Sequence, residues 1–536
     1  MTETSNSLPA SVNFPEWVGN NSKHLLDNLI NKQKRTAQFE SLQKKSQKNR
    51  KAFDRTVQFW ARSSAIYASY KVCQLRVKFV KDKQEQDRIW EEQHEKAADK
   101  LYEMCSGLGG FFLKTAQLLA KPDLAPMAWV KKLVVLCDDA PQTSYAMVQT
   151  VLEAQLGKPM HEIFDRFDEK PLGSASVAQV HRARLKGAGS DVAVKVQHPG
   201  SEELMMTDIR NQKAFAALLQ RFDVKFDLLS VIDELEQQVE YEFDFTREAN
   251  SMDRIAESLS ATNRGKPPVQ VPRSIPGMVT RQVLVMDFVE GTPILRLGDE
   301  MAKRGINPDG TVARLAKRNI MKDITAAYGQ MILRDGFFQA DPHPGNILIN
   351  KHGKVALLDY GQVKELPDGL RLGYAKLVSA LASGNPYKME ESFKDLGLQT
   401  GAKAEEDPVS FRHLAMLLFD TKLPPGMKTA TPFGDETILK KVSVDNFPKD
   451  LFFVLRTVHI LRGLSMGMGI SYSAAEEWKH LAKDALTKAS KFDTNASVNG
   501  TENTEAEIRK LKVEKLTTWE KRRRLKRGRL QGTPVY

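Results

Sequence analysis

The sequence predicts an α+β fold in which a small, strand-containing part is followed by a larger helical part. Two observations lead to this class. Residues 177–185 and 192–197 are short apolar runs separated by a Lys-Gly-Ala-Gly-Ser turn, the pattern of two paired strands. Before and after this pair, apolar residues recur at helical spacing over most of the chain, most continuously after Pro367.

The chain is long enough for several packed units. It has 536 residues, and a typical domain of roughly 100–200 residues suggests about two to four units. A hydrophobic fraction of 41% and a charged fraction of 27% are typical of a soluble globular protein. No stretch approaches the ~20 apolar residues of a membrane-spanning helix. The nearest one, Leu451–Ile470, is interrupted by Arg456, His459 and Arg462, which favours a buried amphipathic helix.

The cysteines and the N-terminal residues give little information about the cellular compartment. Cys73, Cys105 and Cys137 are too few and too unpatterned for a disulfide framework or a zinc site, so a reducing compartment fits best. The first basic residue is Lys23, and Glu16 precedes it, unlike a secretory signal or an organelle transit peptide. We therefore expect no clear transit peptide, and the cytoplasmic face of a membrane stays open as a location.

The net charge of +12 is concentrated at the two ends. Residues 509–529 hold eleven Lys or Arg against two Glu, and residues 32–51 hold eight against one. Such runs are usually solvated helix faces or tails, and peripheral contact with anionic lipid is the sharper alternative. No aromatic residue interleaves the basic cluster 521–527, so nucleic acid is not an expected partner.

The first third of the chain reads as helices. Residues 1–22 lack periodicity, whereas 23–105 carry spaced apolar residues among many charged ones. An apolar helix is predicted over residues 101–120, and Pro122 and Pro126 end it.

The remaining elements follow in order. The two strands at 177–185 and 192–197 precede helices over 202–250. A short strand is predicted over 282–288, and another ends at residue 358. Everything after Pro367 is predicted to be helical until the polar linker at 496–505, which leads to the basic tail.

The residues that carry chemistry begin with Asp341, in the sequence Asp-Pro-His-Pro-Gly-Asn. Asn346 follows Asp341 at the spacing of the protein-kinase loop H-R-D-L-x-x-x-N. Asp359-Tyr-Gly then follows a short strand, as the D-F-G turn does in kinases. Phosphoryl transfer needs one carboxylate near the acceptor and separate oxygen ligands for Mg²⁺. Asp341 is thus the predicted catalytic residue, and Asn346 and Asp359 are the predicted metal ligands. Alone, the segment would be only a turn.

Two upstream segments fit the same template. Val-Ala-Val-Lys at 192–195 matches the V-A-I-K strand, whose lysine, here Lys195, contacts the nucleotide phosphates. Residues 283–289 resemble a hinge strand in which Met286 abuts the adenine and the backbone groups of Asp287 and Val289 bind its edge. An apolar core strand is the plain alternative.

The loop before the second strand departs from ordinary protein kinases. It reads Leu-Gly-Ser-Ala-Ser-Val-Ala-Gln from residue 172, with one glycine where three would let backbone amides approach phosphate closely. The loop must therefore hold a nucleotide differently. Its predicted nucleotide-binding residues are Gly173, Ser174, Ala175, Ser176 and Val177.

With these motifs in order, the chain resembles the UbiB, or AarF-domain, family of atypical kinases over roughly residues 100–485. That family has an alanine-rich loop, a K-x-G-Q motif on an N-terminal helical extension, an E-x-D motif and a D-P-H-P-G-N loop. The counterparts here are Lys114 and Gln117 in Lys-Thr-Ala-Gln, and Glu242 and Asp244 in Glu-Phe-Asp.

The resemblance implies a two-lobed protein-kinase-like fold and several residue roles. Glu248 matches the family's partner for the strand lysine, which implies a Lys195–Glu248 ion pair. The helices around Lys114 and Gln117 would fold over the active site, near the nucleotide and the E-x-D carboxylates. Without the resemblance, the acids of residues 240–248 would be a solvated helix face.

The resemblance also implies how the chain is divided. Residues 1–100 would be an N-terminal helical extension with a disordered start, and 101–160 the K-x-G-Q-type helical segment. The kinase-like N-lobe would cover 161–290 and the C-lobe 291–490, with a linker and basic tail over 491–536.

Three residues depart from the family pattern. Ala116 replaces the motif glycine, and Gly173-Ser174 replaces alanines, which leaves the preference for ATP or ADP open. Gln339 stands where the family usually has histidine. Because glutamine retains hydrogen-bonding capacity, we expect a small structural effect.

The predicted activity is hydrolysis of MgATP or phosphorylation of a small-molecule or lipid-associated substrate. Only residues 362–368 separate Gly361 from the next helical pattern, and no A-P-E segment follows, so a peptide acceptor is disfavoured. The resemblance implies support of prenylquinone biosynthesis or lipid homeostasis in a mitochondrion or plastid, with quinone-biosynthesis enzymes as candidate partners. The alternatives are a protein serine/threonine kinase and a nucleotide-gated scaffold at a membrane.

Overall fold

The chain divides into two compact units. The computed structural model describes residues 50, 52–119, 125–137, 142–222, 228–427 and 444–498. The predictions for residues 1–49 and for the basic tail lie outside the described residues. Unit 1 comprises the chain up to Ala188 with Val194–Asp244 and Arg281–Val283, and unit 2 comprises Gly189–Ala193, Phe245–Thr280 and the chain from Leu284.

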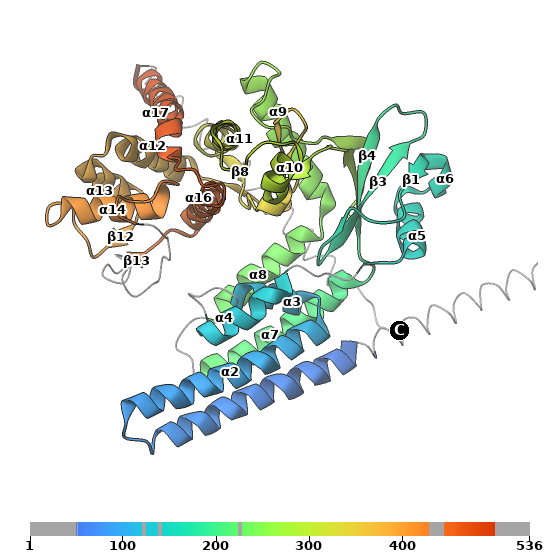
Figure 1. Cartoon of the computed structure of the whole chain (residues 1–536), viewed down its shortest axis with the longest axis vertical. Coiled ribbons are helices and arrows are strands. Elements are labelled where there is room, and N and C mark those ends of the chain that lie inside the picture. Colours follow the sequence, from blue (N-terminus) through green and yellow to red (C-terminus); the bar gives the residue numbers. More distant parts are fainter. Residues whose placement is uncertain are drawn as a thin grey trace, which may run out of the picture. The chain divides into compact units, whose positions relative to one another are not determined.

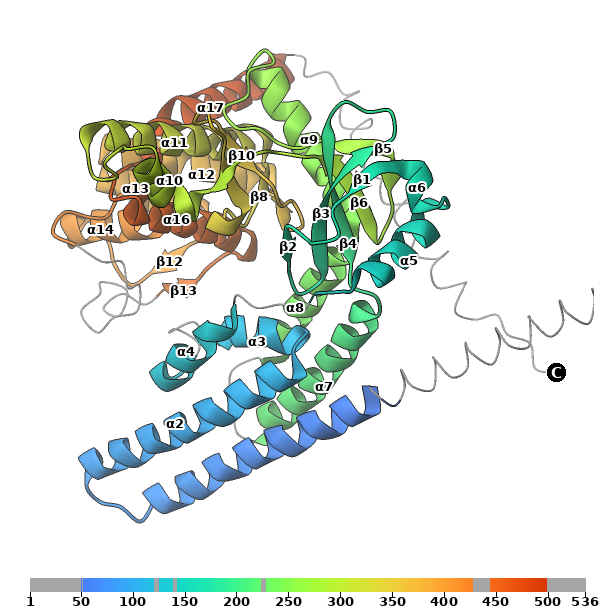
Figure 2. The same ribbon diagram turned by 45° about the vertical axis from the view of Figure 1, so that its right-hand side comes forward.

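Unit 1 begins with a helical hairpin. A helix over residues 52–77 and α2 (Lys83–Leu108) run side by side in both views (Figures 1 and 2). Asp82 caps α2, because its side chain accepts a hydrogen bond from the Gln84 amide. The single helix predicted over 101–120 is wrong. Gly109 and Gly110 have φ of 59° and 58°, in the left-handed region, and so end α2 before α3 (Phe111–Leu119) begins.

A buried ion pair fixes this hairpin to α7 (Ser201–Phe222). The Arg55 guanidinium donates to the two carboxylate oxygens of Asp208 at 2.6 and 2.7 Å, and the Asp208 side chain is fully buried. The same guanidinium donates to the carbonyls of Leu108 and Gly109, where α2 ends. The other helices of unit 1 are α4 (Met127–Leu133), η1 (Val134–Cys137), α5 (Tyr145–Leu156), α6 (Met160–Ile163) and α8 (Leu228–Glu242).

The predicted strand pair is confirmed as β3 (Ala178–Leu185) and β4 (Asp191–Gln197). Both β1 (Phe164–Phe167) and β2 (Gly173–Ser174) pair with β3 in antiparallel fashion, and Figure 2 shows β1 and β3 as neighbours. In strand order the sheet runs β1-β3-β4-β6-β5, and β4 and β6 each have residues in both units. The strand predicted over 282–288 is β6 (Val283–Asp287), which pairs with β5 (Ser274–Val279).

Unit 2 is mainly helical, as predicted. Its helices are α9 (Phe245–Thr262), η2 (Ile294–Arg296), α10 (Leu297–Lys303), α11 (Thr311–Gly329), the π-helix η3 (Gln330–Asp335), η4 (Pro344–Asn346), α12 (Asp368–Ser383), α13 (Pro386–Asp395), α14 (Pro408–Phe419), α16 (Lys449–Gly467) and α17 (Ala474–Val498). Its short strands are β7 (Thr292–Pro293), β8 (Phe337–Gln339), β9 (Ile347–Ile349), β10 (Val355–Leu357), β11 (Val363–Glu365), β12 (Gln399–Thr400) and β13 (Val444–Asn446).

Two features of unit 2 bear on the predictions. The all-helical prediction after Pro367 is wrong at two short strands, β12 and β13, which pair with each other. Strands this short have no periodicity long enough to recognise. The prediction of a buried helix over 451–470 is confirmed as α16, where Arg462 donates to the carbonyl of Leu417 at 2.7 Å, near the C-terminal end of α14.

The core of unit 2 is built where α17 crosses α11. The Trp478 side chain is fully buried, and its indole N–H donates to the Thr325 carbonyl at 2.6 Å. A Cβ added at Gly329 would lie 2.4 Å from the Trp478 ring, so this crossing requires glycine. None of the described helices is long and apolar enough to cross a membrane.

Candidate active site

The segment that carries Asp341 is positioned by a change in helix type. At the end of α11 the chain passes through the π-helix η3 and then Gly336, whose φ of 63° allows a sharp exit into β8. The strand β8 pairs with β11 in a register that sets Gln339 opposite Val363. We call residues 340–346, which follow β8, the Asp341 loop. The pairing places this loop beside the turn that holds Asp359, and Ala340 N–H donates to the Gln362 carbonyl at 2.8 Å.

Gln339 joins the Asp341 loop to the Asp359 turn. Its side chain is 2% exposed, and its Nε2 donates to the carbonyls of Asp341 at 2.8 Å and Asp359 at 3.0 Å. Its Oε1 accepts a hydrogen bond from the Tyr328 hydroxyl. Both Gln339 amide hydrogens and its oxygen are therefore used, and the two backbone segments are held at a fixed separation.

A second link brings Asn346 to the same place. Leu358 N–H donates to the Asn346 carbonyl at 3.0 Å, which sets Asn346 next to the residue before Asp359. The Asp359 carboxylate is itself oriented, because its Oδ1 accepts from Gly361 N–H at 2.9 Å. Unit 2 thus brings together Asp341, Asn346 and Asp359, the three residues that the kinase-like spacing singled out.

Arg456 is a site residue that the sequence did not reveal. Its Nη2 lies 3.2 Å from Asp341 Oδ1, and its Nη1 donates to Gln362 Oε1 at 3.1 Å. Both charged side chains are about a quarter exposed, at 29% and 25%. The sequence places Arg456 in an apolar helix, which favours packing. Its charge in the middle of that helix is the one sign that it has a polar partner nearby.

The helix that bears Glu248 is fixed to the same strands. Arg254 pairs with Glu365 on β11 at 2.8 Å and lies 3.9 Å above the Phe337 ring on β8. Ser258 Oγ donates to the Asp335 carboxylate at 2.7 Å. Glu248 is in the first turn of α9 and is 4% exposed.

A carboxylate buried to this extent needs a charged or hydrogen-bonding partner. Lys195 lies on β4, in unit 1. The Lys195–Glu248 pair stays a prediction.

The predicted adenine-site residues lie at and after the end of β6. Met286 and Val289 are buried, each 7% exposed, and Asp287 is exposed. Asp287 N–H donates to the Arg273 carbonyl at 2.9 Å, and its carboxylate accepts from Arg273 N–H at 3.0 Å. The Asp287 N–H is already bonded to Arg273, the residue before β5. An adenine at this strand would therefore meet the Asp287 carbonyl and not its N–H.

The loop at 173–177 is shaped by its own turn. Gly173 and Ser174 pair with β3, and Ala175 N–H donates to the Ala178 carbonyl at 2.8 Å. Val177 is buried, while Gly173 and Ala175 are exposed. A Cβ added at Gly173 would meet no atom within 4 Å, so an alanine would fit there.

The two unusual motifs of unit 1 meet directly. Lys114 on α3 donates a charged hydrogen bond to the carboxylate of Glu242, the last residue of α8, and the two side chains are 19% and 18% exposed. Gln117 lies on α3 as well, and its side chain is outside the described part. Asp244 follows α8, where its N–H donates to the Tyr241 carbonyl.

Ala116 shows why the departure from glycine is tolerated. It lies on α3, two residues after Lys114, and is fully buried in the hydrophobic core of unit 1. Its methyl group packs where a glycine would leave a gap, and alanine favours the helix by about 1 kcal/mol over glycine.

The donor set near Asp359 fits a magnesium ion bound mainly through a nucleotide. Among the described residues, no group of three or more His, Cys, Asp or Glu is arranged to hold a metal. Mg²⁺ in kinase-type sites needs only one or two protein oxygens, since phosphates and waters supply the rest. The amide oxygen of Asn346 and the carboxylate of Asp359 are oxygen donors of that kind.

Comparisons with known proteins identify the relatives of this chain. A family model described as the ABC1 atypical kinase-like domain matches residues 135–393. AarF domain-containing protein kinase 1 of Gallus gallus is 31% identical over 417 residues, which cover 73% of this chain and 75% of that protein. The protein of the same name from Mus musculus is 30% identical over 400 residues, covering 71% and 72%.

A plant relative is similar over a smaller share of its length. The protein ACTIVITY OF BC1 COMPLEX KINASE 8, chloroplastic, of Arabidopsis thaliana is 28% identical over 421 residues, which cover 71% of this chain and 53% of that protein. The fold is therefore that of an atypical, protein-kinase-like α+β protein. The chain belongs to the ABC1, or AarF-domain (UbiB), family, and the resemblance found in its sequence is confirmed.

Proposed function

We propose that this chain binds MgATP and hydrolyses it, or transfers its γ-phosphoryl group to a small-molecule or lipid-associated acceptor. The observation that carries the proposal is the Gln339 side chain, which holds the backbone of Asp341 and of Asp359 together at 2.8 and 3.0 Å. A centre assembled in this way supplies the carboxylate and the oxygen ligands that phosphoryl transfer requires.

Each residue has a role in this proposal. Asp341 orients or deprotonates the acceptor, which is water or a hydroxyl group. Asn346 and Asp359 would hold Mg²⁺, which neutralises charge on the phosphates when bound. Lys195 would contact the phosphates and pair with Glu248, and residues 173–177, Met286, Asp287 and Val289 would enclose the nucleotide. Arg456, whose Nη2 lies 3.2 Å from Asp341 Oδ1, would orient that carboxylate.

The acceptor is proposed to be small because the segment between Gly361 and the next helix is too short to dock a peptide. After Gly361, β11 occupies Val363–Glu365 and α12 begins at Asp368. In protein kinases the corresponding position opens an activation segment that ends in A-P-E and positions the substrate. We also propose that the helix bearing Lys114 and Gln117 forms a lid over the nucleotide. Glu242 and Asp244 would lie next to these two residues.

The biological setting is proposed from the family. We place the activity in prenylquinone biosynthesis or lipid homeostasis, in a mitochondrion or plastid, with peripheral membrane contact through the basic termini. The plant relative is named chloroplastic, which supports a setting of this type. Profiles of quinones and their precursors in cells that lack the protein would connect the site to the pathway or remove that connection.

The decisive experiment uses Asp341→Asn in the full chain. We expect phosphate release from ATP to fall by orders of magnitude while nucleotide binding is retained, because the substitution removes the base and leaves the fold. Asp309→Asn, in an exposed loop, is the matched control and should leave turnover unchanged. Undiminished turnover in Asp341→Asn would refute the assignment. Transfer of radiolabelled phosphate to added proteins that depends on Asp341 would favour a protein kinase instead.

A further inference from the structure

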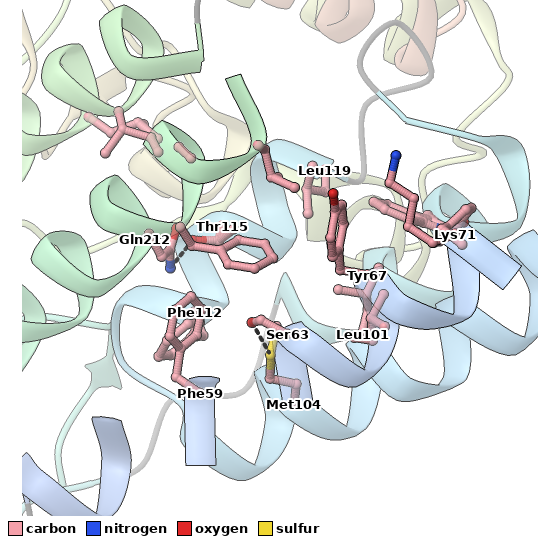
Figure 3. Close-up of a pocket in the computed structure, with 18 of the residues that line it drawn as sticks. Phe59, Ser63, Tyr67, Lys71, Leu101, Met104, Phe112, Thr115, Leu119 and Gln212 are labelled. Atoms are coloured by element: carbon pink, nitrogen blue, oxygen red, sulfur yellow. Dashed lines mark hydrogen bonds between the residues drawn. The ribbon is translucent and has the colours of Figure 1, made fainter. Parts of the chain in front are cut away.

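Unit 1 contains a large apolar cavity that has no part in the site described above. Its volume is about 470 Å³, and it lies between helix 52–77, α2, α3, α4, α7 and α8 (Figure 3). Cavities of this size are within the range of small-molecule sites, roughly 300–1,000 Å³.

The residues that line the cavity are mostly apolar, and their charge is confined to one end. The lining is mostly aromatic and aliphatic, with Phe59, Leu101 and Phe112 among the residues of its interior. Among the lining residues of the described chain, Lys71 is the sole charged side chain, and none is acidic. In Figure 3, Phe59 and Phe112 lie at one side of the cavity and Lys71 at the other. The occupant that matches this distribution has a long apolar part and one acidic group.

Polar and aromatic groups gather where Lys71 stands. The Lys71 ammonium lies 5.6 Å from the Tyr67 ring centre and donates to Gln74 Oε1 at 3.3 Å. At the preceding position on the same helix, the ring of Tyr70 stacks on Trp90 with centroids 6.4 Å apart and meets Trp129 edge-on at 6.2 Å. This end of the cavity is therefore amphipathic, and the opposite end is apolar.

Two polar groups in this region still have hydrogen-bonding capacity. The Tyr70 hydroxyl is hydrogen-bonded to His94 Nδ1 at 2.8 Å, and burial raises the pKa of Tyr70 to about 12, so it stays neutral. The indole N–H of Trp129 lies near that hydroxyl, but among the described residues no acceptor meets it with hydrogen-bond geometry. A buried donor of this kind is costly unless something else accepts from it.

We infer that this cavity binds a single-chain amphiphile with an acidic head group, such as a long-chain fatty acid. The hydrocarbon chain lies among Phe59, Leu101 and Phe112, and the carboxylate lies at Lys71, where it gains an ion pair. The helices enclose the space on several sides, so a thin, flexible chain fits it and a folded partner does not.

The position of the cavity connects its occupant to the Lys114–Glu242 pair. Phe112 and Thr115 on α3 line the cavity, and so does Leu235 on α8. Lys114 lies between the first two on α3, and Glu242 ends α8. A bound chain therefore packs against both helices that hold this ion pair. The binding itself does not depend on the proposed function, because it requires neither nucleotide nor turnover.

The experiment titrates the full chain with cis-parinaric acid, a fluorescent fatty acid that accepts excitation energy from Trp90 and Trp129. We expect saturable energy transfer at one fatty acid per chain. Ala216→Phe, which fills the cavity from α7, should weaken binding about ten-fold or more. Ala217→Phe is the matched control, because Ala217 is exposed on the same helix and does not line the cavity. This variant should bind the fatty acid as the unmodified chain does.

Substitution of the lysine in the cavity tests the acidic head group. Lys71→Gln should weaken the fatty acid several-fold and leave competition by the matched fatty alcohol unchanged, whereas Lys78→Gln, at an exposed position outside the cavity, should change neither. Equal binding of the acid to both lysine variants would overturn the head-group assignment. This comparison decides the question if Ala216→Phe does not fold.

Three results would overturn the site itself. These are non-saturable transfer, equal affinity of Ala216→Phe and the unmodified chain, and binding to anionic phosphatidylserine vesicles in place of the free acid. The last result would assign the lipid contact to the protein surface. The fatty-acid titration requires neither ATP nor turnover, so its outcome is independent of the proposed ATPase or kinase activity.

Discussion

The Asp341 loop of unit 2 and the Lys114–Glu242 pair of unit 1 are held by different means. In unit 2, a fully engaged and buried glutamine joins two backbone segments, and its partners include the buried Tyr328. In unit 1, one ion pair with both side chains nearly one-fifth exposed joins α3 to α8. The first arrangement has several bonds that must break together, and the second has one.

The difference indicates what each region is suited to do. A centre that stabilises charge in a transition state must be preorganised, and the Gln339 network provides fixed geometry. A single, partly exposed ion pair contributes only about 1 kcal/mol, so this contact is the weaker of the two. The residues proposed to perform chemistry are thus held by several hydrogen bonds, and the contact proposed to cover them consists of one ion pair.

The largest effect should come from Gln339→Leu. This change removes the hydrogen bonds that Gln339 makes with the Tyr328 hydroxyl and with the carbonyls of Asp341 and Asp359 in a buried site. At roughly 1 kcal/mol for each of the three lost hydrogen bonds, we expect a loss of about 3 kcal/mol in the free energy of unfolding. Turnover should fall together with stability, and chemical denaturation combined with an ATPase assay would measure both.

Gln330→Leu is the control for this change. Gln330 is also buried on the π-helix, but among the described residues its side chain bonds only to Asn263, at 2.8 Å, away from the Asp341 loop. It should lose about 1 kcal/mol and retain turnover. Equal losses of turnover in both variants would show that the Gln339 network has no special role.

The sequence predicted much of this centre and missed the rest for a physical reason. Asp341, Asn346 and Asp359 have a fixed spacing along the chain, and spacing can be recognised without a structure. The Gln339 bridge depends on the register of β8 against β11, two strands of three residues each, which leave no periodic signal. Arg456 is more than a hundred residues from Asp341, and only the packing of α16 brings them together.

Helix boundaries show the same limit. The run of apolar residues over 101–120 predicts one helix, and the two glycines in its middle decide otherwise, because both adopt positive φ. Isolated glycines are tolerated inside helices at modest cost, so composition alone does not decide between the two outcomes.

Acid should weaken unit 2 through His459 on α16. Burial and the neighbouring Arg462 cation lower the pKa of His459 to about 4, against an unfolded value near 6.5. The unfolded state therefore binds the proton first. The contribution of neutral His459 is complete above about pH 6.5 and is lost as the pH falls towards 4, by up to about 3 kcal/mol. His459→Gln should flatten this part of the stability–pH profile, and an unchanged profile would contradict the prediction.

Arg456→Met should have a smaller effect that is specific to turnover. It removes the cation 3.2 Å from Asp341 and the bond to Gln362 while keeping most of the apolar side chain. We expect about a ten-fold loss in kcat, equivalent to ~1.4 kcal/mol, with the KM for nucleotide unchanged. Arg456→Lys should recover part of the loss, because it keeps the charge but not the two-pronged geometry. A purely structural role would instead lower the unfolding free energy of both variants to the same extent.

The smallest effect, and the most direct test of the weak region, is the coupling between Lys114 and Glu242. A double-mutant cycle with Lys114→Met and Glu242→Gln should give a coupling of about 1 kcal/mol in the free energy of unfolding, since the pair is only partly screened by water. The matched pair Lys132–Asp99, also in unit 1, has a distance of 2.7 Å but side chains 47% and 62% exposed, so its coupling should be near zero. A Lys114–Glu242 coupling of 3 kcal/mol or more, roughly the size expected for a fully buried pair, would show that this contact is as fixed as the Gln339 network. In that case the contrast between a rigid centre and a weakly held cover would no longer stand.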